Sequence, residues 1–408
     1  MRSVLHTTDE VIIAGAGIGG LCTALCLAKA GIAVRVLEQA SEISEVGAGI
    51  QLSPNACHVL AALGLMPALQ AVAVQPEALQ MRYGQTGKLI FSIPAGDEAV
   101  ARWGAPYLHI HRTDLIRVLV NALEQAAPNA IATNTTVIGY RHAANGVTVQ
   151  TEHGADIDAA LLVGADGIRS VIRRQMLNSA PPRYTGNCAW RMMIEADALT
   201  GHTLPHSACV WVGDKRHAVT YRVRGGDLVN LVAVVEQREW DQESWTSKGS
   251  RDEALADFSG WHPIITTIIS EAKAHYQWAL FDRPALNQWH DTRAVLLGDA
   301  CHPMLPFLAQ GAAMAIEDAW VLAASLTANA EVAQALGAYQ AARLLRTTQV
   351  QHGARANQRT FHYGGVLSQA LVYGGMRAAS TIVPGFINSR QDWIYATDVT
   401  EQYPLRIR

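Results

Sequence analysis

The chain has 408 residues, half of them hydrophobic, and a formal net charge of −3 at pH 7. That length can bury a large core and favours two domains, while the slight excess of acid provides no broad basic surface for nucleic acid phosphates. No apolar run reaches the roughly 18 residues that cross a bilayer, and the N-terminal segment lacks the apolar core of a signal peptide.

The first predicted element is a buried strand that runs directly into a glycine-rich turn. Residues 11–20 read VIIAGAGIGG, with the motif glycines at Gly15, Gly17 and Gly20. Glycine at these places permits a tight turn, close approach to a pyrophosphate and close packing of the next helix. A second apolar strand stops at Glu38, about 20 residues farther on, where an acid suits a ribose hydroxyl. The chain therefore begins with a dinucleotide-binding unit.

Further turns follow along the chain. A glycine-rich loop occupies residues 47–55, and HRTDL at 111–115 opens a helix for which Thr113 is the expected N-cap. One buried strand leads into Gly-Ala-Asp-Gly at 164–167, and another ends at Gly-Asp, 298–299. Because ligands bind at the carboxyl ends of strands in open α/β sheets, both turns are expected to contact the dinucleotide.

Between these two turns the sequence changes to strands with several tryptophans. Segments 210–212, 218–223 and 228–235 are expected to be neighbours in one antiparallel sheet. The predicted fold is therefore α/β, with a Rossmann-like dinucleotide-binding domain interrupted by a β-sheet-rich substrate domain and followed by a C-terminal helical segment. The expected segments are 1–180 with a strand excursion near 78–101, the β-rich 181–278, the return of the first domain at 279–360, and the helical tail 361–408.

Taken together, the motifs resemble those of the single-component FAD-dependent aromatic hydroxylases, which include 3-hydroxybenzoate 6-hydroxylase, salicylate hydroxylase and 6-hydroxynicotinate 3-monooxygenase. The resemblance extends over nearly the whole chain and rests on GAGIGG at 15–20, GAGIQLSPN at 47–55, HRTDL at 111–115, GADGIRS at 164–170 and GDACHPMLPFLAQGAAMAIEDA at 298–319. It implies bound FAD, with NADH or NADPH docking only to reduce it, since the chain has one dinucleotide fingerprint. In one departure, Ser44-Glu45-Val46 stands where many relatives have an arginine.

The resemblance implies a set of cofactor contacts. It assigns Glu38 to the adenosine ribose, Arg112 to the FAD phosphate region and Asp299 to the ribitol chain. It assigns Asp166 to FAD and the visiting nicotinamide nucleotide, and Pro303 to the flavin face. The other expected cofactor residues are Gly15, Gly17, Gly20, Gln51, Gln310, Gly311 and Ala312.

The reaction that the resemblance implies needs an electron-rich ring such as a phenolate, and therefore a base. His217 and Tyr221 stand four residues apart in an expected strand, so they face one side about 13 Å apart and can bracket a small ring. The 3-hydroxybenzoate and 6-hydroxynicotinate enzymes have a His and a Tyr at this spacing. The resemblance thus makes His217 the candidate base and Tyr221 a hydrogen-bond partner of the substrate. Read alone, a histidine after Lys215-Arg216 is more typical of a surface turn.

Other candidates for the substrate pocket are Gln51, Cys209, Phe307 and Gln310, which match positions on the substrate side of the flavin in relatives. The hydroxynicotinate enzymes have histidines at the positions of Gln51 and Phe307, so the residues found here favour a benzene ring over a pyridine carboxylate.

Several charged residues have open alternatives. Arg191, Arg222 and Arg224 are each candidates for a substrate carboxylate, although a solvated sheet edge is expected for at least two of them. His302 is expected to be structural. Glu317 and Asp318 are expected to complement the dipole of the helix in which they lie.

We therefore expect an FAD-dependent monooxygenase that uses NAD(P)H and O2 to hydroxylate a phenolic aromatic acid, such as 3-hydroxybenzoate or salicylate, through a flavin C4a-hydroperoxide. The six cysteines show neither a CxxC pair nor zinc spacing, so a cytoplasmic location and no metal are expected. The expected partner is a small aromatic substrate, not nucleic acid or membrane, and the chain is expected to be a monomer or homodimer. The alternatives are a hydroxylase of a hydroxypyridine or other N-heteroaromatic acid, a flavin reductase or dehydrogenase, and a non-catalytic flavoprotein.

Overall fold

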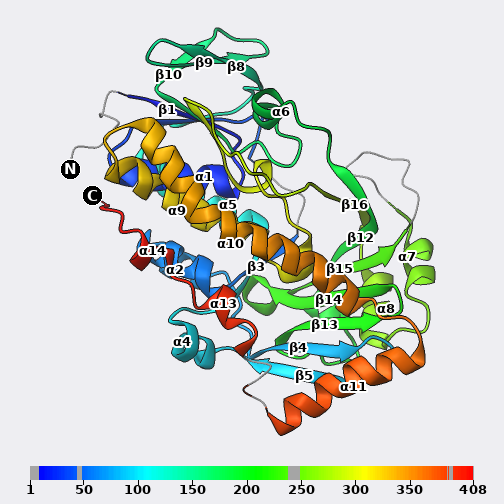
Figure 1. Ribbon diagram of the computed structural model, residues 1–408. Helices are drawn as coiled ribbons and strands as arrows, with labels where there is room; N and C mark the ends of the chain where they lie inside the picture. The colour runs from blue at the N-terminus through cyan, green and yellow to red at the C-terminus, as the bar shows by residue number, and fades with distance from the viewer. Residues whose placement is uncertain (1–8, 44–47, 238–248, 384, 386–388, 408) are drawn as a thin grey trace.

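The computed structural model describes residues 9–43, 48–237, 249–383, 385 and 389–407, and it confirms the expected α/β class (Figure 1). A parallel sheet with its helices forms one part of the molecule, and a larger sheet forms the other. The helix α10 (Val332–Phe361) runs from the first part toward the second. The segment Ser44-Glu45-Val46 and the first residue of the 47–55 loop lie outside the described residues.

The smaller of these sheets is parallel, with the strand order β17-β11-β1-β2-β7. Its strands are β1 (Val11–Ala14), β2 (Val34–Leu37), β7 (Ile131–Ala132), β11 (Leu161–Gly164) and β17 (Ala294–Leu296). β1, β11 and β17 are buried along their whole length, as continuous apolar runs in a covered parallel sheet must be. Helix α1 (Ile18–Lys29) packs against α5 (Arg112–Ala126) and α9 (Gly311–Ala328). The glycine turn and the Gly-Asp loop therefore lie at the same edge of one sheet.

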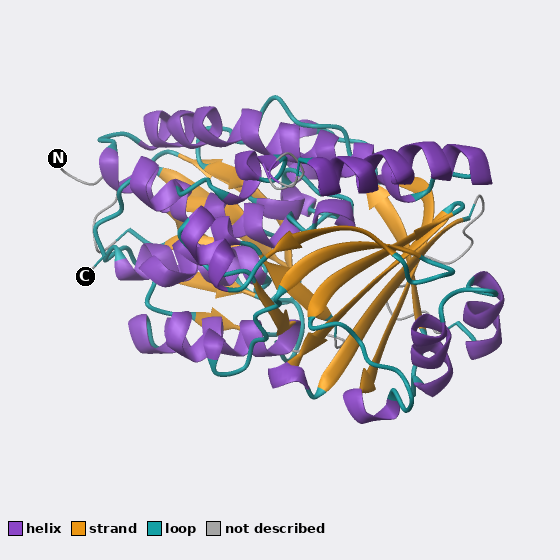
Figure 2. Cartoon of the chain, turned by 90° about the horizontal axis from the view of Figure 1, so that it is seen from below, coloured by secondary structure: helices purple, strands orange, loops and turns teal. Residues whose placement is uncertain are grey.

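The larger sheet, seen as a twisted array of strands in Figure 2, has the order β16-β12-β15-β14-β13-β4-β5. All its pairs are antiparallel except β13 with β4. Its strands are β4 (Ala78–Tyr83), β5 (Leu89–Pro94), β12 (Arg183–Glu195), β13 (Ser207–Gly213), β14 (Arg216–Val223), β15 (Leu228–Glu236) and β16 (Tyr276–Asp282). The expected adjacency of 210–212, 218–223 and 228–235 is confirmed. The expected excursion near 78–101 supplies two strands to this sheet.

One face of the larger sheet is covered by α7 (Arg251–Asp257) and α8 (Pro263–Glu271), which bury Trp190 and Trp211 in an apolar cluster. This stretch is helical where the sequence suggested strands. The sequence does contain helix-start signals here, because Ser250 and Glu253 form a capping box and Pro263 is the first residue of α8. The other face of the sheet is left to form the site described below.

The remaining elements are small or terminal. They are β3 (Gly49–Leu52) paired with β6 (Leu108–His111), the three-stranded sheet of β8 (Val137–Ala143), β9 (Gly146–Thr151) and β10 (Ile157–Ala159), and the helices α2 (Pro54–Ala62), α3 (Met66–Gln70), α4 (Asp97–Trp103), α6 (Val171–Leu177), α11 (Val366–Ile382), α13 (Asp392–Tyr395) and α14 (Val399–Gln402). The expected N-cap at Thr113 is wrong: β6 runs straight into α5, so His111 holds that position. We keep the division at residues 180, 278 and 360 as a proposal. No helix within the described ranges is long and apolar enough to span a membrane.

Candidate active site

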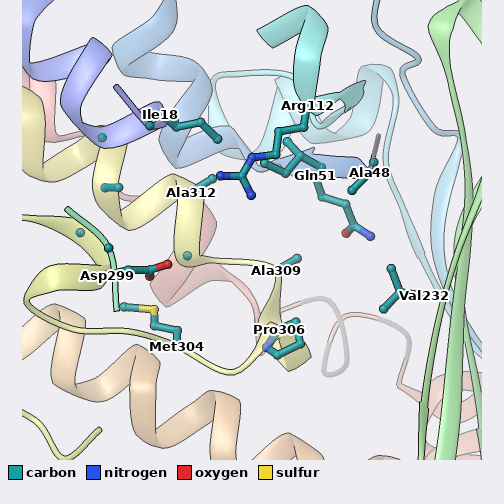
Figure 3. A pocket seen from close by; sticks show the side chains of 18 of the residues that line it. Ile18, Ala48, Gln51, Arg112, Val232, Asp299, Met304, Pro306, Ala309 and Ala312 are labelled. Carbon is teal, nitrogen blue, oxygen red and sulfur yellow. The ribbon is translucent and has the colours of Figure 1, made fainter. Parts of the chain in front are cut away.

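A cavity of about 310 Å³ lies between the two sheets. Its walls are the start of α1, the loop after β17, the start of α9 and the inner face of the larger sheet. Arg112, Gln51 and Asp299 point into it from different elements, and Val232 faces it from the larger sheet (Figure 3). Residues as far apart in the sequence as Gln51 and Asp299 therefore share one space.

The glycine fingerprint forms one end of the cavity. Gly15 has φ +104°, and a Cβ there would lie 2.6 Å from the carbonyl oxygen of Ala165. A Cβ on Gly20 would lie 2.0 Å from the Gly15 carbonyl oxygen, so this glycine permits the turn and helix to touch. By contrast, a Cβ on Gly17 would meet no atom within 4 Å. The first and third glycines thus serve packing, and the second leaves open space beside the helix start.

Two of the expected acids act on the backbone of nearby turns. Glu38 accepts hydrogen bonds from the amides of Ala16 (2.8 Å) and Ala40 (2.9 Å), which fixes the turn from the end of β2. Asp166 accepts through Oδ2 from the amide of Val171 at 2.8 Å, at the start of α6. Its other oxygen, Oδ1, is buried without a hydrogen-bond partner in the described residues. Neither acid lines the large cavity itself.

Two arginines and two helix N-termini line the cavity. The N-termini of α1 and α9 both open onto it, and helix N-termini attract anions. Burial lowers the pKa of Arg112, and Asp299 opposes that shift. Asp299 is open to the cavity but surrounded by protein beyond it, which raises the pKa of its carboxyl against the effects of His302 and Arg112. The arrangement suits a ligand with phosphate groups.

Arg191 adds a second cation to the same wall. Its guanidinium lies 3.9 Å from the centroid of the Trp278 ring, and Nε is buried without a hydrogen-bond partner in the part of the chain that is described. Burial lowers its pKa to about 10, Tyr221 opposes this, and Arg112 adds repulsion. The alternative of a solvated sheet edge fits the other two arginines better, since Arg222 bonds to the Gly226 carbonyl and Arg224 to Asp114.

The structure brings His217 and Tyr221 to one face of β14, where both line the cavity. His217 is 2% exposed and Tyr221 3%, so the alternative of a surface histidine is wrong. Val219 lies between them and is in register with Val232 of β15, which in turn is opposite Arg191 of β12. A row of side chains across three strands thus connects the arginine to the His–Tyr pair. Burial is the main cause that lowers the pKa of His217 and raises that of Tyr221.

A second cavity of about 150 Å³ adjoins the first and shares His217, Val219 and Gln51 with it. Its other walls are mainly apolar and include Phe307, Phe361 and Tyr395. The ring of Phe307 lies edge-on to that of His217, with centroids 5.2 Å apart. An apolar cavity of this volume holds one benzene ring.

Gln51 is oriented at the border of the two cavities. The hydroxyl of Tyr107 donates to Gln51 Oε1 at 2.7 Å. The amide oxygen is therefore engaged, which leaves the Gln51 NH₂ as the group presented to a ligand.

The structure does not bring every expected residue to the site. Cys209 points to the opposite face of β13, into the cluster under α7 and α8, because side chains alternate along a strand. Pro303 is buried and its carbonyl accepts from Gln351, while Met304 and Pro306 line the cavity. The side chain of Gln310 is also buried rather than cavity-facing. It donates to Ser53 Oγ at 2.9 Å and so connects the start of α9 to the loop before α2.

The interpretation of Glu317 and Asp318 as helix-dipole residues is wrong. Both are fully buried in the second and third turns of α9. Arg343 of α10 donates to Glu317 at 2.6 Å and to Asp318 at 2.8 Å. Asp318 also bonds to His302 at 2.5 Å, in keeping with the expected structural role of that histidine. Because His302 follows β17, this ionic cluster fixes the cavity loops on the helices behind them.

Several other wall residues carry no recognisable motif in the sequence. Val232, Val234, Pro306 and Ala309 became visible only through the register of β15 and the path of the loop after β17. No group of three or more His, Cys, Asp or Glu side chains within the described ranges is arranged to hold a metal ion.

The comparisons with known proteins agree with this geometry. The model of the FAD binding domain family matches residues 8–354. The chain is 36% identical over 363 residues to 3-amino-4-hydroxybenzoate 2-monooxygenase of Streptomyces platensis, covering 89% of this chain and 91% of that protein. It is 35% identical over 391 residues to 3-hydroxybenzoate 6-hydroxylase of Polaromonas naphthalenivorans, covering 95% and 96%. The chain belongs to the FAD-dependent aromatic-ring monooxygenases.

Among solved structures, this monooxygenase is similar to a salicylate hydroxylase in a substrate complex. The TM-score is 0.81 at 26% sequence identity, with 97% of each chain covered. The expected family, flavoprotein class and enzyme class are thereby confirmed.

Proposed function

We propose that this monooxygenase uses NADH or NADPH and O2 to hydroxylate a phenolic aromatic acid in the cavity beside His217. The observation that carries the proposal is the position of His217 at the junction of a cationic cavity and an apolar one. A dinucleotide fits the first, and one aromatic ring fits the second. Similarity to 3-hydroxybenzoate 6-hydroxylase and to a salicylate hydroxylase supports a benzene-ring acid.

The residues of the first cavity fit FAD. The open space beside Gly17, two helix N-termini and Arg112 suit the pyrophosphate, and Glu38 is near enough to the turn to serve the ribose. Asp299, Gly311 and Ala312 would hold the part of FAD nearer its ring system. Asp166 Oδ1, which has no hydrogen-bond partner among the described residues, would accept a hydrogen bond from the cofactor. When bound, FAD supplies the reduction by NAD(P)H and the activation of O2. A nicotinamide nucleotide would share the groove near Asp166.

The substrate would lie across Val219, between His217 and Tyr221. His217 would accept the phenol proton, and Tyr221 and the Gln51 NH₂ would donate hydrogen bonds to substrate oxygens. Arg191 would pair with a carboxylate, because its guanidinium is desolvated and its Nε has no hydrogen-bond partner among the described residues. Phe307 and its apolar neighbours would exclude water from the ring.

A hydroxypyridine acid is the second candidate. Gln51 and Phe307 both border the second cavity, and no histidine stands at either position, which favours the benzene ring. All six cysteines are free and buried, which supports the proposed location in the reducing cytoplasm.

The test is a panel of hydroxybenzoates, salicylate and hydroxypyridine carboxylates with the FAD-loaded protein. NADH and NADPH oxidation, O2 uptake, product mass and H2O2 are measured together. We expect one phenolic benzoate to stimulate oxidation and gain one oxygen atom. A compound that stimulates NAD(P)H oxidation but yields only H2O2 would be an effector and not a substrate. Turnover without O2 uptake would favour a reductase or dehydrogenase.

A further inference from the structure

A chain of hydrogen bonds leads from His217 to the protein surface. His217 Nδ1 lies 2.7 Å from His362 Nε2, and His362 Nδ1 lies 3.0 Å from Glu236 Oε1. The first two side chains are buried, whereas the Glu236 side chain is 39% exposed. The three residues come from β14, the end of α10 and the end of β15. We propose that His362 and Glu236 form a proton relay that connects His217 to solvent.

The chain of bonds fixes the position of each proton. A carboxylate only accepts, so His362 must donate to Glu236 through Nδ1–H. A neutral His362 then presents a bare Nε2, to which His217 must donate through its own Nδ1–H. This leaves the lone pair of His217 on Nε2, which has no hydrogen-bond partner within the described residues. Glu236 therefore selects, through two rings, the tautomer in which His217 can act as a base.

The relay also solves an energetic difficulty for His217. Burial, and to a lesser extent His362, lower the pKa of His217, so an imidazolium there is unfavourable. The rings of Phe307 and Phe361 lie about 5 Å from the His217 ring and exclude water from it. A proton on His217 is therefore disfavoured, and the side chain is almost inaccessible to solvent. A route through His362 removes the proton without storing charge at His217.

The second histidine is a better place for transient positive charge. His362 follows the last residue of α10, where the helix dipole favours a cation. Burial lowers its pKa, but the hydrogen bond and charge of Glu236 oppose that shift. The other nearby charged residues, Lys215 and Arg216, precede or begin β14. Lys215 bonds to the His362 carbonyl through its amide, and Arg216 donates to the carbonyls of Asp214 and Asp257.

The transfer balances without any co-reactant. The phenol proton moves to His217 Nε2, the Nδ1 proton of His217 to His362 Nε2, and the Nδ1 proton of His362 to Glu236, which releases it to water. Both rings end neutral, each in the other tautomer. The relay resets when the product phenolate takes the Nε2 proton and the protons shift back. His362 and Glu236 are thus positioning and relay residues, and of these three residues only His217 touches the substrate.

The test uses the full-length FAD-loaded enzyme with His362→Gln and Glu236→Gln, since neither glutamine can pass a proton on. The exposed His352 of α10 provides the matched control, His352→Gln. With the phenolic acid identified by the panel, we expect kcat of both relay variants to fall about tenfold or more below the phenol pKa and to recover above it. The control should match wild type throughout, and KM should change little. A uniform loss at every pH, or no loss, would overturn the relay.

A second measurement needs no substrate. Nitrogen-15 NMR of histidine-labelled protein reports the tautomer of each ring, with His217 and His362 assigned from the variants. We expect a protonated Nδ1 and bare Nε2 on both rings of the wild type at neutral pH. A protonated Nε2 on His217 would overturn the relay. This proposal rests on the proposed function for its substrate, but the two fail differently: an inactive panel with the expected tautomers refutes the function alone, and normal turnover in both variants refutes the relay alone.

Discussion

Removing the Arg343 guanidinium tests whether the buried ionic cluster holds the cavity loops in place. Arg343 is 1% exposed and pairs with both Glu317 and Asp318. In Arg343→Met the chain keeps most of its volume, while two fully buried carboxylates lose a shared cation. Glu317 would keep Arg346 and Asn55, and Asp318 would keep His302 and the amide of Gly298. Breaking a buried pair from one side costs about 3–5 kcal/mol.

That cost converts into a measurable shift in Tm. Unfolding entropy of about 2.1 cal/mol/K per residue, over 408 residues that unfold together, gives a fall of about 4–6 °C. Burial alone would raise the pKa of both acids, but in the wild type Arg343, with Arg346 or His302, holds them below their usual values. Because the two pKa values are lower in the folded than in the unfolded protein, these acids add stability above their unfolded pKa values, near pH 4. That stability is lost as the pH falls through their folded pKa values. In the variant, burial becomes the dominant influence on Asp318 and raises its pKa. The loss of stability relative to the wild type should therefore be largest at pH 7 and shrink toward pH 5.

Thermal unfolding followed by circular dichroism and flavin fluorescence at pH 5 and 7 measures both effects. The matched control is Arg35→Met, which breaks a pair with Glu10 between exposed and half-exposed side chains and should cost under about 1 kcal/mol. We also expect flavin to be released before the backbone unfolds, because Asp318 and His302 fix the loop that carries Asp299. A loss no larger than that of the control, or a deficit independent of pH, would refute the reasoning.

Three further predictions concern the cavity. Asp299→Asn should weaken FAD binding about tenfold, measured as the Kd from flavin fluorescence, and unchanged retention at low FAD would contradict its assignment. His217→Ala should retain FAD but hydroxylate about 100-fold more slowly below the phenol pKa, and a pH–rate profile like that of the wild type would remove it from the mechanism. Arg191→Met should raise KM for a phenolic acid about 10- to 100-fold while hardly affecting the same phenol without its carboxylate. Equal effects on both compounds would show that Arg191 serves the cofactor or the fold.

The sequence predicted the cofactor side of the fold well because its signals are local. A glycine turn, the strand before it and the helix after it are adjacent in the chain, so the VIIAGAGIGG stretch largely determines its own structure. The second sheet was harder. Its strands were recognisable from alternation, but the parallel contact of β13 with β4 joins segments more than 120 residues apart. The helices α7 and α8 have capping signals, but these short segments stand among strands whose alternation is the stronger pattern.

The site shows the same division between local and long-range information. His217 and Tyr221 could be placed on one face because a strand has period two. The same rule places Cys209 on the opposite face of the strand from its neighbour Val210, which faces the second cavity, and so excludes Cys209 from the site. The shared arginine partner of Glu317 and Asp318 lies 25 or more residues away on α10, and His362 lies 145 residues from His217. No local pattern reports such contacts, so the ionic cluster and the proposed relay required coordinates.

The proposed relay and the cavity cations would divide the task of ionising a phenol. Loss of the proton leaves a negative charge on the ring oxygen, and a buried imidazolium next to it would be the usual source of compensation. Here burial makes His217 a poor cation, while the guanidinium of Arg191 lies in the wall of the same cavity. We infer that the anionic substrate is stabilised by the fixed charge of Arg191 and by the hydrogen bond from Tyr221, neither of which needs a proton transfer before it can act. The histidine then has only to move the proton, and a neutral chain that ends at Glu236 is sufficient for that.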